Sequence, residues 1–455
     1  MNARSLPEAP GALPVLGHAM QLWHRPLPFL RGLTGIGEVV RLRLGPRSAY
    51  LACSGAAVSQ VLHDPRAFDK GGPLFERARL VVGDGLVSSD YATHRRQRRL
   101  VQPAFAANRL AGYAALISAQ VEAELASWRA GHPFDVGRAM HALALRVAAR
   151  TMFGGQLAEP AVASVVAALP VIMRGVYQRM IIPGEFVHRL PVRANRRFEQ
   201  AQATMRRVIS DTLRAHRRSG RDLSDVLSIL AGRDGTAALR DDEIHDQVMT
   251  MLIGGTEPPG DAMSWVLHLL ATHSADERAV QEEVDAVLDG RPVDSDHLPD
   301  LVRVRRAVTE AMRLYPPAWL LSRAVTRDTE LAGYPVARGT TVLFSPYQRH
   351  HDPEIFPDPL RFDPDRWCDP SPAARAALLP FGAGNRKCIG DEMALTELVM
   401  TVAAVMSRFR LRPERDSVVR PVARASLSPG RVLMIAEPRR ASRSTPPSGP
   451  RTVIP

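Results

Sequence analysis

Apolar residues follow a helical period over most of the chain and a strand-like period in short stretches near its ends. In the clearest helical run, apolar side chains recur every three or four residues, at Leu395, Leu398, Val399, Val402, Val405 and Met406. Residues 40–44 instead alternate apolar and polar side chains, turn at residues 45–46, and return over residues 49–53. These patterns predict a mainly α protein with a minor β-sheet region.

Other segments have less regular patterns. Residues 105–235 are predicted to be mainly helical, residues 417–437 to form strands, and the glycine-interrupted residues 71–90 to be a loop. One long helix is predicted over about residues 242–272, although Gly-Gly and Pro-Pro pairs interrupt its centre. A proline inside a helix costs roughly 3 kcal/mol and removes a hydrogen bond. Because such conflicts tend to mark functional sites, we expect one here.

Composition narrows the function classes. The 455 residues carry a formal net charge of +12, and arginine supplies most of the excess. Aromatic residues make up only 5% and do not interleave with the basic residues. The chain is therefore a poor candidate for nucleic acid binding. A basic face for an acidic protein partner is the better interpretation.

Cysteine usage and the N-terminus indicate a compartment. Three cysteines, Cys53, Cys368 and Cys388, are too few for a disulfide framework and fit a reducing environment. The N-terminal residues contain no signal-peptide pattern and no apolar run near the ~20 residues that a membrane helix needs. We therefore expect a cytoplasmic protein without a membrane anchor.

One stretch presents a cysteine where a loop meets a helix. Residues 381–390 read Phe-Gly-Ala-Gly-Asn-Arg-Lys-Cys-Ile-Gly and run into the helical segment described above. The free amides at a helix N-terminus favour a thiolate over a thiol, and the glycines let the backbone approach a flat group. A thiolate presented in this way suits a soft metal or haem iron. The alternative is a buried loop cysteine without a ligand.

Phe381, Gly384, Arg386, Cys388 and Gly390 resemble the haem-binding loop of the cytochrome P450 family. The resemblance implies a single-domain cytochrome P450 fold over residues 1–437. The polar, proline-rich composition of residues 438–455 predicts a disordered tail. It implies haem b as the cofactor, with Cys388 as the axial thiolate. The residues of this loop that would bind the cofactor are Phe381, Gly382, Arg386 and Cys388.

The family resemblance extends to two further groups of residues. His94 and Arg98 stand four apart on one predicted helix face, and Arg323 lies in a later segment. The family uses matching residues to hold haem propionates, whereas the sequence alone is equally consistent with an exposed basic helix face. A second group matches the structural Glu-Arg-Arg set of the family, at Glu310, Arg313 and Arg366.

The interrupted helix departs from the family pattern, in which an acid precedes a threonine above the haem. Here the order is Gly254, Gly255, Thr256, Glu257 and Pro258, so the acid is kept and proline replaces the alcohol. In the family this alcohol organises the protons needed to split the O–O bond. We hypothesise that ordered water, Glu257 or a substrate hydroxyl replaces it. Thr256 is a weak substitute because it points to roughly the opposite helix face, and the Gly255 carbonyl would face the oxygen site.

The family implies a monooxygenase that uses molecular oxygen and electrons from a ferredoxin and a ferredoxin reductase. Residues 79–86, 94–105 and 190–198 look like actinobacterial members that act on cyclic terpenes. An apolar small-molecule substrate is therefore expected, specifically a sesquiterpene or diterpene. Two alternatives stay open. Peroxide-using fatty-acid oxygenases of the family also carry proline at the alcohol position, and a haem-binding ligand carrier would not oxygenate at all.

Overall fold

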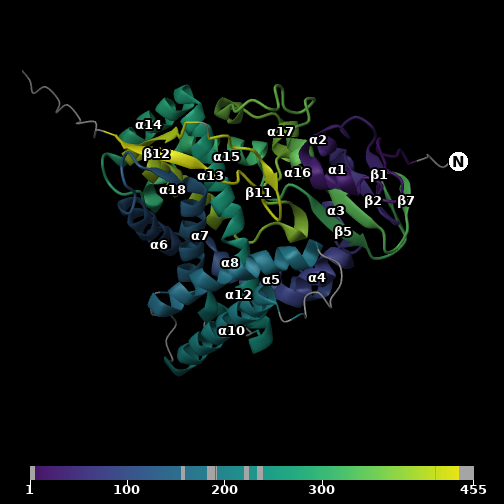
Figure 1. Cartoon of the computed structure of the whole chain (residues 1–455), viewed down its shortest axis with the longest axis horizontal. Helices are drawn as coiled ribbons and strands as arrows, with labels where there is room; N and C mark the ends of the chain where they lie inside the picture. Colours follow the sequence, from purple (N-terminus) through teal and green to yellow (C-terminus); the bar gives the residue numbers. More distant parts are fainter. Residues whose placement is uncertain are drawn as a thin grey trace, which may run out of the picture.

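The computed structural model describes residues 6–154, 159–181, 190, 192–219, 225–232, 239–415 and 417–439. Helices make up most of the molecule, and a small sheet with the N-terminus occupies one end (Figure 1). The predicted mainly α fold with a minor sheet is confirmed. Of the tail predicted over residues 438–455, residues 440–455 lie outside the described residues. The prediction is wrong for the first two, since Pro438 ends a strand and Arg439 forms an ion pair with Asp285 at 2.7 Å.

The helices fall into three stretches of the chain. The first comprises α1 (Ala19–His24), α2 (Pro26–Arg31), α3 (Gly55–His63), α4 (Gly72–Val82), α5 (Tyr91–Val101), η1 (Gln102–Phe105), α6 (Ala107–Ala126) and α7 (Val136–Phe153). The second comprises α8 (Glu159–Ile181), α10 (Arg193–Ser219), α11 (Val226–Leu230), α12 (Asp241–Gly254), α13 (Glu257–Thr272) and α14 (Ser274–Leu288). The third comprises η3 (Ser295–His297), α15 (Val302–Leu314), α16 (Pro346–His350), η4 (Pro364–Trp367), α17 (Pro372–Ala377), η5 (Gly384–Arg386) and α18 (Asp391–Arg408).

The main sheet has the strand order β1-β2-β8-β5-β3. Its strands are β1 (Val39–Leu44), β2 (Arg47–Ala52), β3 (Phe68–Asp69), β5 (Leu321–Val325) and β8 (Thr341–Phe344). The predicted hairpin is confirmed, since β1 and β2 pair antiparallel around Gly45, whose φ of +64° suits glycine. At the other edge, Asp69 of β3 pairs with Ala324 of β5. The sheet thereby brings residues near position 70 beside Arg323.

Three smaller sheets complete the fold. β4 (Pro133–Asp135), β12 (Leu433–Pro438) and β9 (Phe409–Pro413) form one sheet, β10 (Val422–Ala423) pairs with β11 (Leu427–Ser428), and β6 (Thr329–Leu331) pairs with β7 (Tyr334–Val336). The strands predicted over residues 417–437 are thus present as β10, β11 and β12.

Helix α13 runs through the larger hydrophobic core, against residues of α7, α15 and α18. Most of its side chains from residue 259 to 270 are buried, and the Trp265 indole stacks on the Tyr315 ring at 3.6 Å. A second core joins α7, α8, α10 and α12. Burial of the apolar stripes of these helices is the main favourable term for the fold. It also fixes α12 and α13 relative to the Cys388 loop.

Two sequence predictions about elements are wrong. Residues 71–90 contain a helix, α4, which begins with Pro73 in its first turn and ends at Gly83 with φ of +73°. The glycines that suggested a loop are the caps of this helix. The long helix of residues 242–272 is two helices, α12 and α13, because the hydrogen-bond ladder breaks at Gly255 and Thr256.

Among the described residues, no helix has both the length and the apolar composition needed to cross a membrane.

Candidate functional site

Cys388 lies between η5 and α18, two residues before the Gly390 N-cap. Its backbone N–H donates to the Phe381 carbonyl at 2.9 Å, which closes the loop. Gly382 and Gly384 adopt φ of +67° and +66°. A Cβ on Gly384 would lie 2.2 Å from the Leu62 carbonyl oxygen, so only glycine fits there. The glycines therefore hold the loop against α3 and direct the chain into α18.

The Cys388 side chain is accessible, and yet burial raises the pKa of its thiol. Accessibility and a raised pKa are compatible when the sulfur lies in a recess that protein atoms surround on most sides. The Gly390 backbone N–H donates to the sulfur and lowers the pKa, but burial outweighs it. The helix N-terminus alone therefore does not give the thiolate that the sequence suggested. A bound metal cation would supply the missing compensation.

A group of basic side chains gathers on the neighbouring surface of the sheet and α5. It comprises Lys70, His94, Arg98, Arg323 and Arg386, which we name the cation cluster. Asp69 accepts a hydrogen bond from Arg386, and Arg98 donates to the Lys387 carbonyl at 2.7 Å. Arg386 Nε and Nη1 are buried and receive no partner among the described residues. The site therefore retains unused donors.

The cation cluster is electrostatically unfavourable as it stands. Burial, Arg386, Arg98 and Lys70 lower the pKa of His94 to about 3. Burial and Arg386 lower the pKa of Arg323 to about 10, and burial lowers the pKa of Lys70 well below its usual range. Buried charges need opposite charges. The residues therefore fit a ligand with carboxylates, as the propionates of a haem would provide, beside a thiol that suits its iron.

Sequence reasoning identified His94, Arg98, Arg323 and Arg386, and the structure brings them together. It missed Lys70, which follows β3. Burial and the charges of Arg323 and Arg386 lower the pKa of this lysine. No local motif marks this lysine, because its position depends on the pairing of β3 with β5. A correct prediction that these two distant strands pair would have identified Lys70 as a residue of the site.

The structure also brings together the Glu310, Arg313 and Arg366 side chains. Glu310 and Arg313 are fully buried and form two hydrogen bonds of 2.8 and 2.9 Å, while Arg366 Nε lies 3.4 Å from Glu310. Arg313 also donates to the carbonyls of His350 and Pro359, each at 2.8 Å. The set ties α15 to the chain that leads into the Cys388 loop, and its bonds satisfy both buried charges.

The break between α12 and α13 has a defined hydrogen-bond pattern. The Thr256 N–H donates to the Ile253 carbonyl at 3.3 Å, and the Thr256 hydroxyl donates to the Leu252 carbonyl at 2.6 Å. Thr256 is buried, so its hydroxyl proton is already used within its own helix. Pro258 has no N–H to give to the Gly254 carbonyl. A Cβ on Gly254 would meet no atom within 4 Å, so this turn borders open space.

Glu257 begins α13 and is half-buried. Burial and the neighbouring Asp261 raise the pKa of Glu257, whereas His141 and Arg424 lower it. A partly buried carboxyl with a raised pKa is a candidate for proton transfer. Gly255, Thr256, Glu257 and Pro258 thus lie together at one turn, and Glu257 is the titratable group among them.

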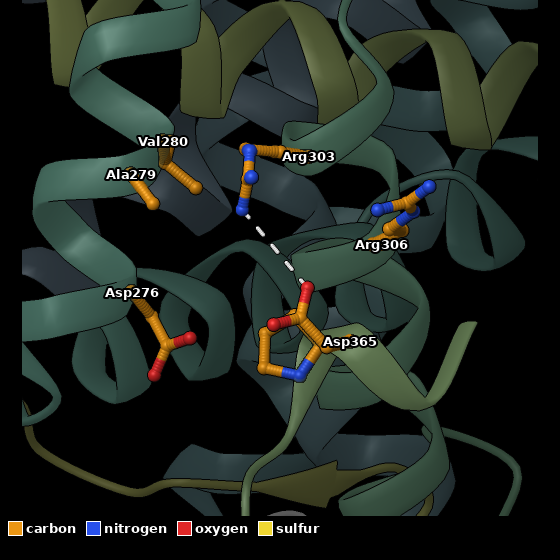
Figure 2. Close-up of a pocket in the computed structure, with 7 residues that line it drawn as sticks. Asp276, Ala279, Val280, Arg303, Arg306 and Asp365 are labelled. Atoms are coloured by element: carbon orange, nitrogen blue, oxygen red, sulfur yellow. Dashed lines mark ion pairs between the residues drawn. The ribbon is translucent and has the colours of Figure 1, made fainter. Parts of the chain in front are cut away.

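Two hollows elsewhere are separate from this site. Figure 2 shows a small one between α14, α15 and η4, where Arg303 and Asp365 form an ion pair at 4.0 Å. Its volume of about 10 Å³ has room for about one water molecule. A larger hollow of about 400 Å³ lies beside Tyr113 and Asp225. Neither is lined by Cys388 or by the cation cluster.

Comparison with known proteins agrees with this geometry. Residues 7–439 match the sequence profile of the cytochrome P450 family. The chain is 44% identical over 436 residues to the cyclooctat-9-en-7-ol 5-monooxygenase of Streptomyces melanosporofaciens, covering 95% of each. It is 44% identical to the cyclooctatin synthase of the same organism, again over 95% of each. It is 41% identical to the pentalenene oxygenase of Streptomyces avermitilis, over 92% of this chain and 94% of the relative.

Proposed function

Since the chain belongs to the cytochrome P450 family and is a haem-thiolate monooxygenase, we propose that it oxidises a cyclic terpene. The names of its similar Streptomyces relatives support this substrate class, because two of them specify cyclooctat-9-en-7-ol and pentalenene. The similarity extends over almost the whole of both chains, so the aligned region includes the segments around the site. A sesquiterpene or a diterpene is the expected size of substrate.

The observation that carries the site assignment is the cation cluster beside the accessible Cys388 thiol. Cys388 would bind the haem iron, and His94, Arg98, Arg323 and Arg386 would hold the haem propionates. Phe381 and Gly382 shape the loop that carries the ligand. Lys70 joins the set because its buried ammonium lies beside Arg323 and Arg386.

When bound, the haem supplies the oxygen chemistry, and its thiolate ligand favours O–O cleavage. The protein holds the substrate, limits water and delivers protons. The Gly390 N–H donates to the Cys388 sulfur and so moderates its charge. At the break between α12 and α13, Glu257 would supply the protons that the missing alcohol would have organised. Pro258 and Pro259 leave the carbonyls of Gly254 and Gly255 without helical donors, and these carbonyls can anchor water.

We further propose that electrons come from a ferredoxin and its reductase. The net charge of +12 favours association with an acidic carrier. Lys387 lies next to Cys388 with its side chain 49% exposed, and it is placed to contact such a carrier. We propose a cytoplasmic enzyme, in keeping with the three free cysteines.

The test is a spin-state titration of the purified ferric protein with pentalenene, cyclooctat-9-en-7-ol and palmitate. An apolar ligand that displaces water from the iron shifts the Soret band toward the high-spin form. We expect a saturable shift with at least one terpene and none with palmitate. A shift with palmitate alone, together with product formed from peroxide without reductase, would favour the fatty-acid alternative. Binding of a terpene without any product under electron supply would favour the ligand carrier.

A further inference from the structure

His141 and Asp261 form a pair on the side of α13 that faces α7. His141 lies on α7 and Asp261 on α13, and the two helices pack side by side (Figure 1). His141 Nε2 lies 3.3 Å from Asp261 Oδ1. The Asp261 side chain is 3% exposed, whereas the His141 side chain is 33% exposed. The pair therefore joins a buried carboxylate to a group that solvent reaches.

Gly260 makes room for the imidazole ring. A Cβ at this position would lie 2.9 Å from both Cγ and Cδ2 of His141, and 3.0 Å from its Cα. Because real Cβ atoms do not approach so closely, a larger residue would push α7 away from α13. The glycine next to Asp261 thus keeps the ring within reach of the carboxylate.

The hydrogen bonds of the ring determine where its protons lie. His141 Nδ1 lies 2.7 Å from the Gly137 carbonyl oxygen, which can only accept, so Nδ1 carries a proton. Nε2 is then the atom that gains or loses a proton, and it faces Asp261. Burial lowers the pKa of His141, but Asp261 and Glu257 raise it, and the net direction is upward. The ring is therefore suited to carry a proton at Nε2.

The Asp261 carboxylate can accept a further hydrogen bond. Its Oδ1 is buried and receives no well-aligned hydrogen bond from the described residues, although His141 lies at ion-pair distance. Buried oxygens of this kind tend to bind ordered water or a proton. Glu257 lies four residues earlier, one turn away on the same face of α13. Arg424, from the turn between β10 and β11, also faces Glu257.

We propose that His141 and Asp261 are positioning residues that relay protons from solvent to Glu257, in place of the alcohol that Pro258 removes. The proposal rests on the monooxygenase assignment and on the role of Glu257 described above. It adds the route by which Glu257 regains the proton that it delivers.

The relay moves one proton and no electrons. His141 gives the proton on Nε2 to the Asp261 carboxylate. Asp261 gives a proton through ordered water to the Glu257 carboxylate, and His141 regains a proton from solvent. The net change is transfer of one proton from solvent to Glu257.

A purely structural ion pair between α7 and α13 is the alternative. Its loss would lower stability, but it would not change the proton supply or the dependence of turnover on deuterated solvent. Asp294→Asn is a matched control, because Asp294 forms a similar pair with His297, at 2.7 Å, in η3. Neither residue of that pair belongs to the site.

The experiment compares the wild-type holoenzyme with Asp261→Asn, His141→Phe and Asp294→Asn. The pKa of His141 is measured by NMR on ¹³C-labelled histidine in the diamagnetic ferrous–CO form. Product and peroxide per NADPH are measured with pentalenene, in H₂O and D₂O. We expect Asp261→Asn to lower the pKa of His141, to cut product per NADPH roughly tenfold in favour of peroxide, and to enlarge the solvent isotope effect. Asp294→Asn should change none of these.

An unchanged pKa of His141 or unchanged product per NADPH in Asp261→Asn would overturn the relay. If Asp261→Asn cannot be isolated with haem, His141→Phe decides the question through the same ratio of product to peroxide. Failure of the terpene proposal has a different signature, since the wild type would then form no product from pentalenene. In that case the NMR titration of His141 and the solvent isotope effect on NADPH oxidation still test the relay.

Discussion

Arg323 illustrates how single residues prepare the site for a ligand. Its side chain is 3% exposed, it donates to the Ser322 carbonyl at 2.8 Å, and its guanidinium lies 5.3 Å from the Phe344 ring centre. Burial and Arg386 lower its pKa to about 10. Keeping a buried charge beside other charges destabilises the protein without its ligand. The cation cluster is therefore a binding feature that costs stability.

Arg323→Met should weaken haem binding while leaving the haem-free protein as stable as before, or more stable. Loss of one charge-assisted hydrogen bond, worth about 1.5–3 kcal/mol, corresponds to roughly 10- to 100-fold in affinity. Haem transfer to apomyoglobin and chemical unfolding measure the two effects. Arg327→Met, at a 65% exposed side chain nearby, is the control and should change neither. Unchanged haem affinity in Arg323→Met would remove this residue from the site.

His350 should make the protein sensitive to acid. Its Nε2 accepts from the Leu379 N–H at 2.8 Å, and its Nδ1 donates to the Arg313 carbonyl at 3.1 Å. Burial, His351 and Arg313 lower the pKa of His350 to about 3. In the unfolded chain His350 has a pKa near 6.5. Between about pH 6.5 and 3 it therefore binds a proton in the unfolded state but not in the folded state. The contribution of His350 to the free energy of unfolding is therefore fully present above this pH window, and it is lost as the pH falls through the window.

His350→Gln should flatten this acid dependence by up to about 1.4 kcal/mol per pH unit. Urea unfolding of the haem-loaded protein between pH 7 and 4 measures the slope. His132→Gln, at an exposed position, serves as the control. Equal slopes in both variants would contradict the assignment.

At the scale of elements, the break between α12 and α13 is the feature that separates this chain from its family pattern. Pro258 and Pro259 cannot donate to the carbonyls of Gly254 and Gly255, and the Thr256 hydroxyl bonds to the Leu252 carbonyl. The turn therefore offers acceptors and a carboxyl, but no free alcohol. We therefore propose that proton delivery comes from Glu257, His141 and Asp261.

Pro258→Thr should have little effect on product per NADPH in the wild-type background, because Glu257 already supplies protons. In the Asp261→Asn background it should restore most of the lost product, since a threonine hydroxyl can organise water at the same turn. Product and peroxide per NADPH with pentalenene measure both effects. A large gain in the wild-type background would show that the missing alcohol limits turnover.

Element prediction from the sequence succeeded where the signal was local. The β1–β2 hairpin follows from alternation around Gly45, and α18 from its apolar period. It failed for α4, because glycines cap that helix at both ends. It also missed Lys70 and His141, whose roles arise from strand pairing and from helix packing against Gly260. Such contacts join residues that are distant in sequence, and a single sequence carries no local signal for them.

At the scale of the whole molecule, the fold gathers the site from distant segments. The sheet brings Lys70 beside Arg323, α5 contributes His94, and the loop before α18 contributes Cys388. The buried Glu310–Arg313 pair fixes the segment that leads to this loop. The net charge of +12 surrounds the assembly with a positive field.

Electron delivery by an acidic ferredoxin should therefore depend strongly on salt. Raising ionic strength from about 0.01 M to about 1 M shortens the Debye length from about 30 Å to about 3 Å, so the association rate should fall steeply. Stopped-flow reduction at increasing ferredoxin concentration measures this rate. Reduction by a neutral small-molecule donor is the control and should vary little. Equal salt dependence for both donors would contradict a basic docking face.

The most direct test of the whole account is oxygen incorporation from ¹⁸O₂. The holoenzyme is incubated with pentalenene or cyclooctat-9-en-7-ol, ferredoxin, ferredoxin reductase and NADPH under ¹⁸O₂, and the products are analysed by mass spectrometry. The account predicts a hydroxylated terpene that contains one ¹⁸O atom and that is absent when Cys388 is replaced by serine. A product without ¹⁸O, or one that forms only when peroxide is added, would contradict it.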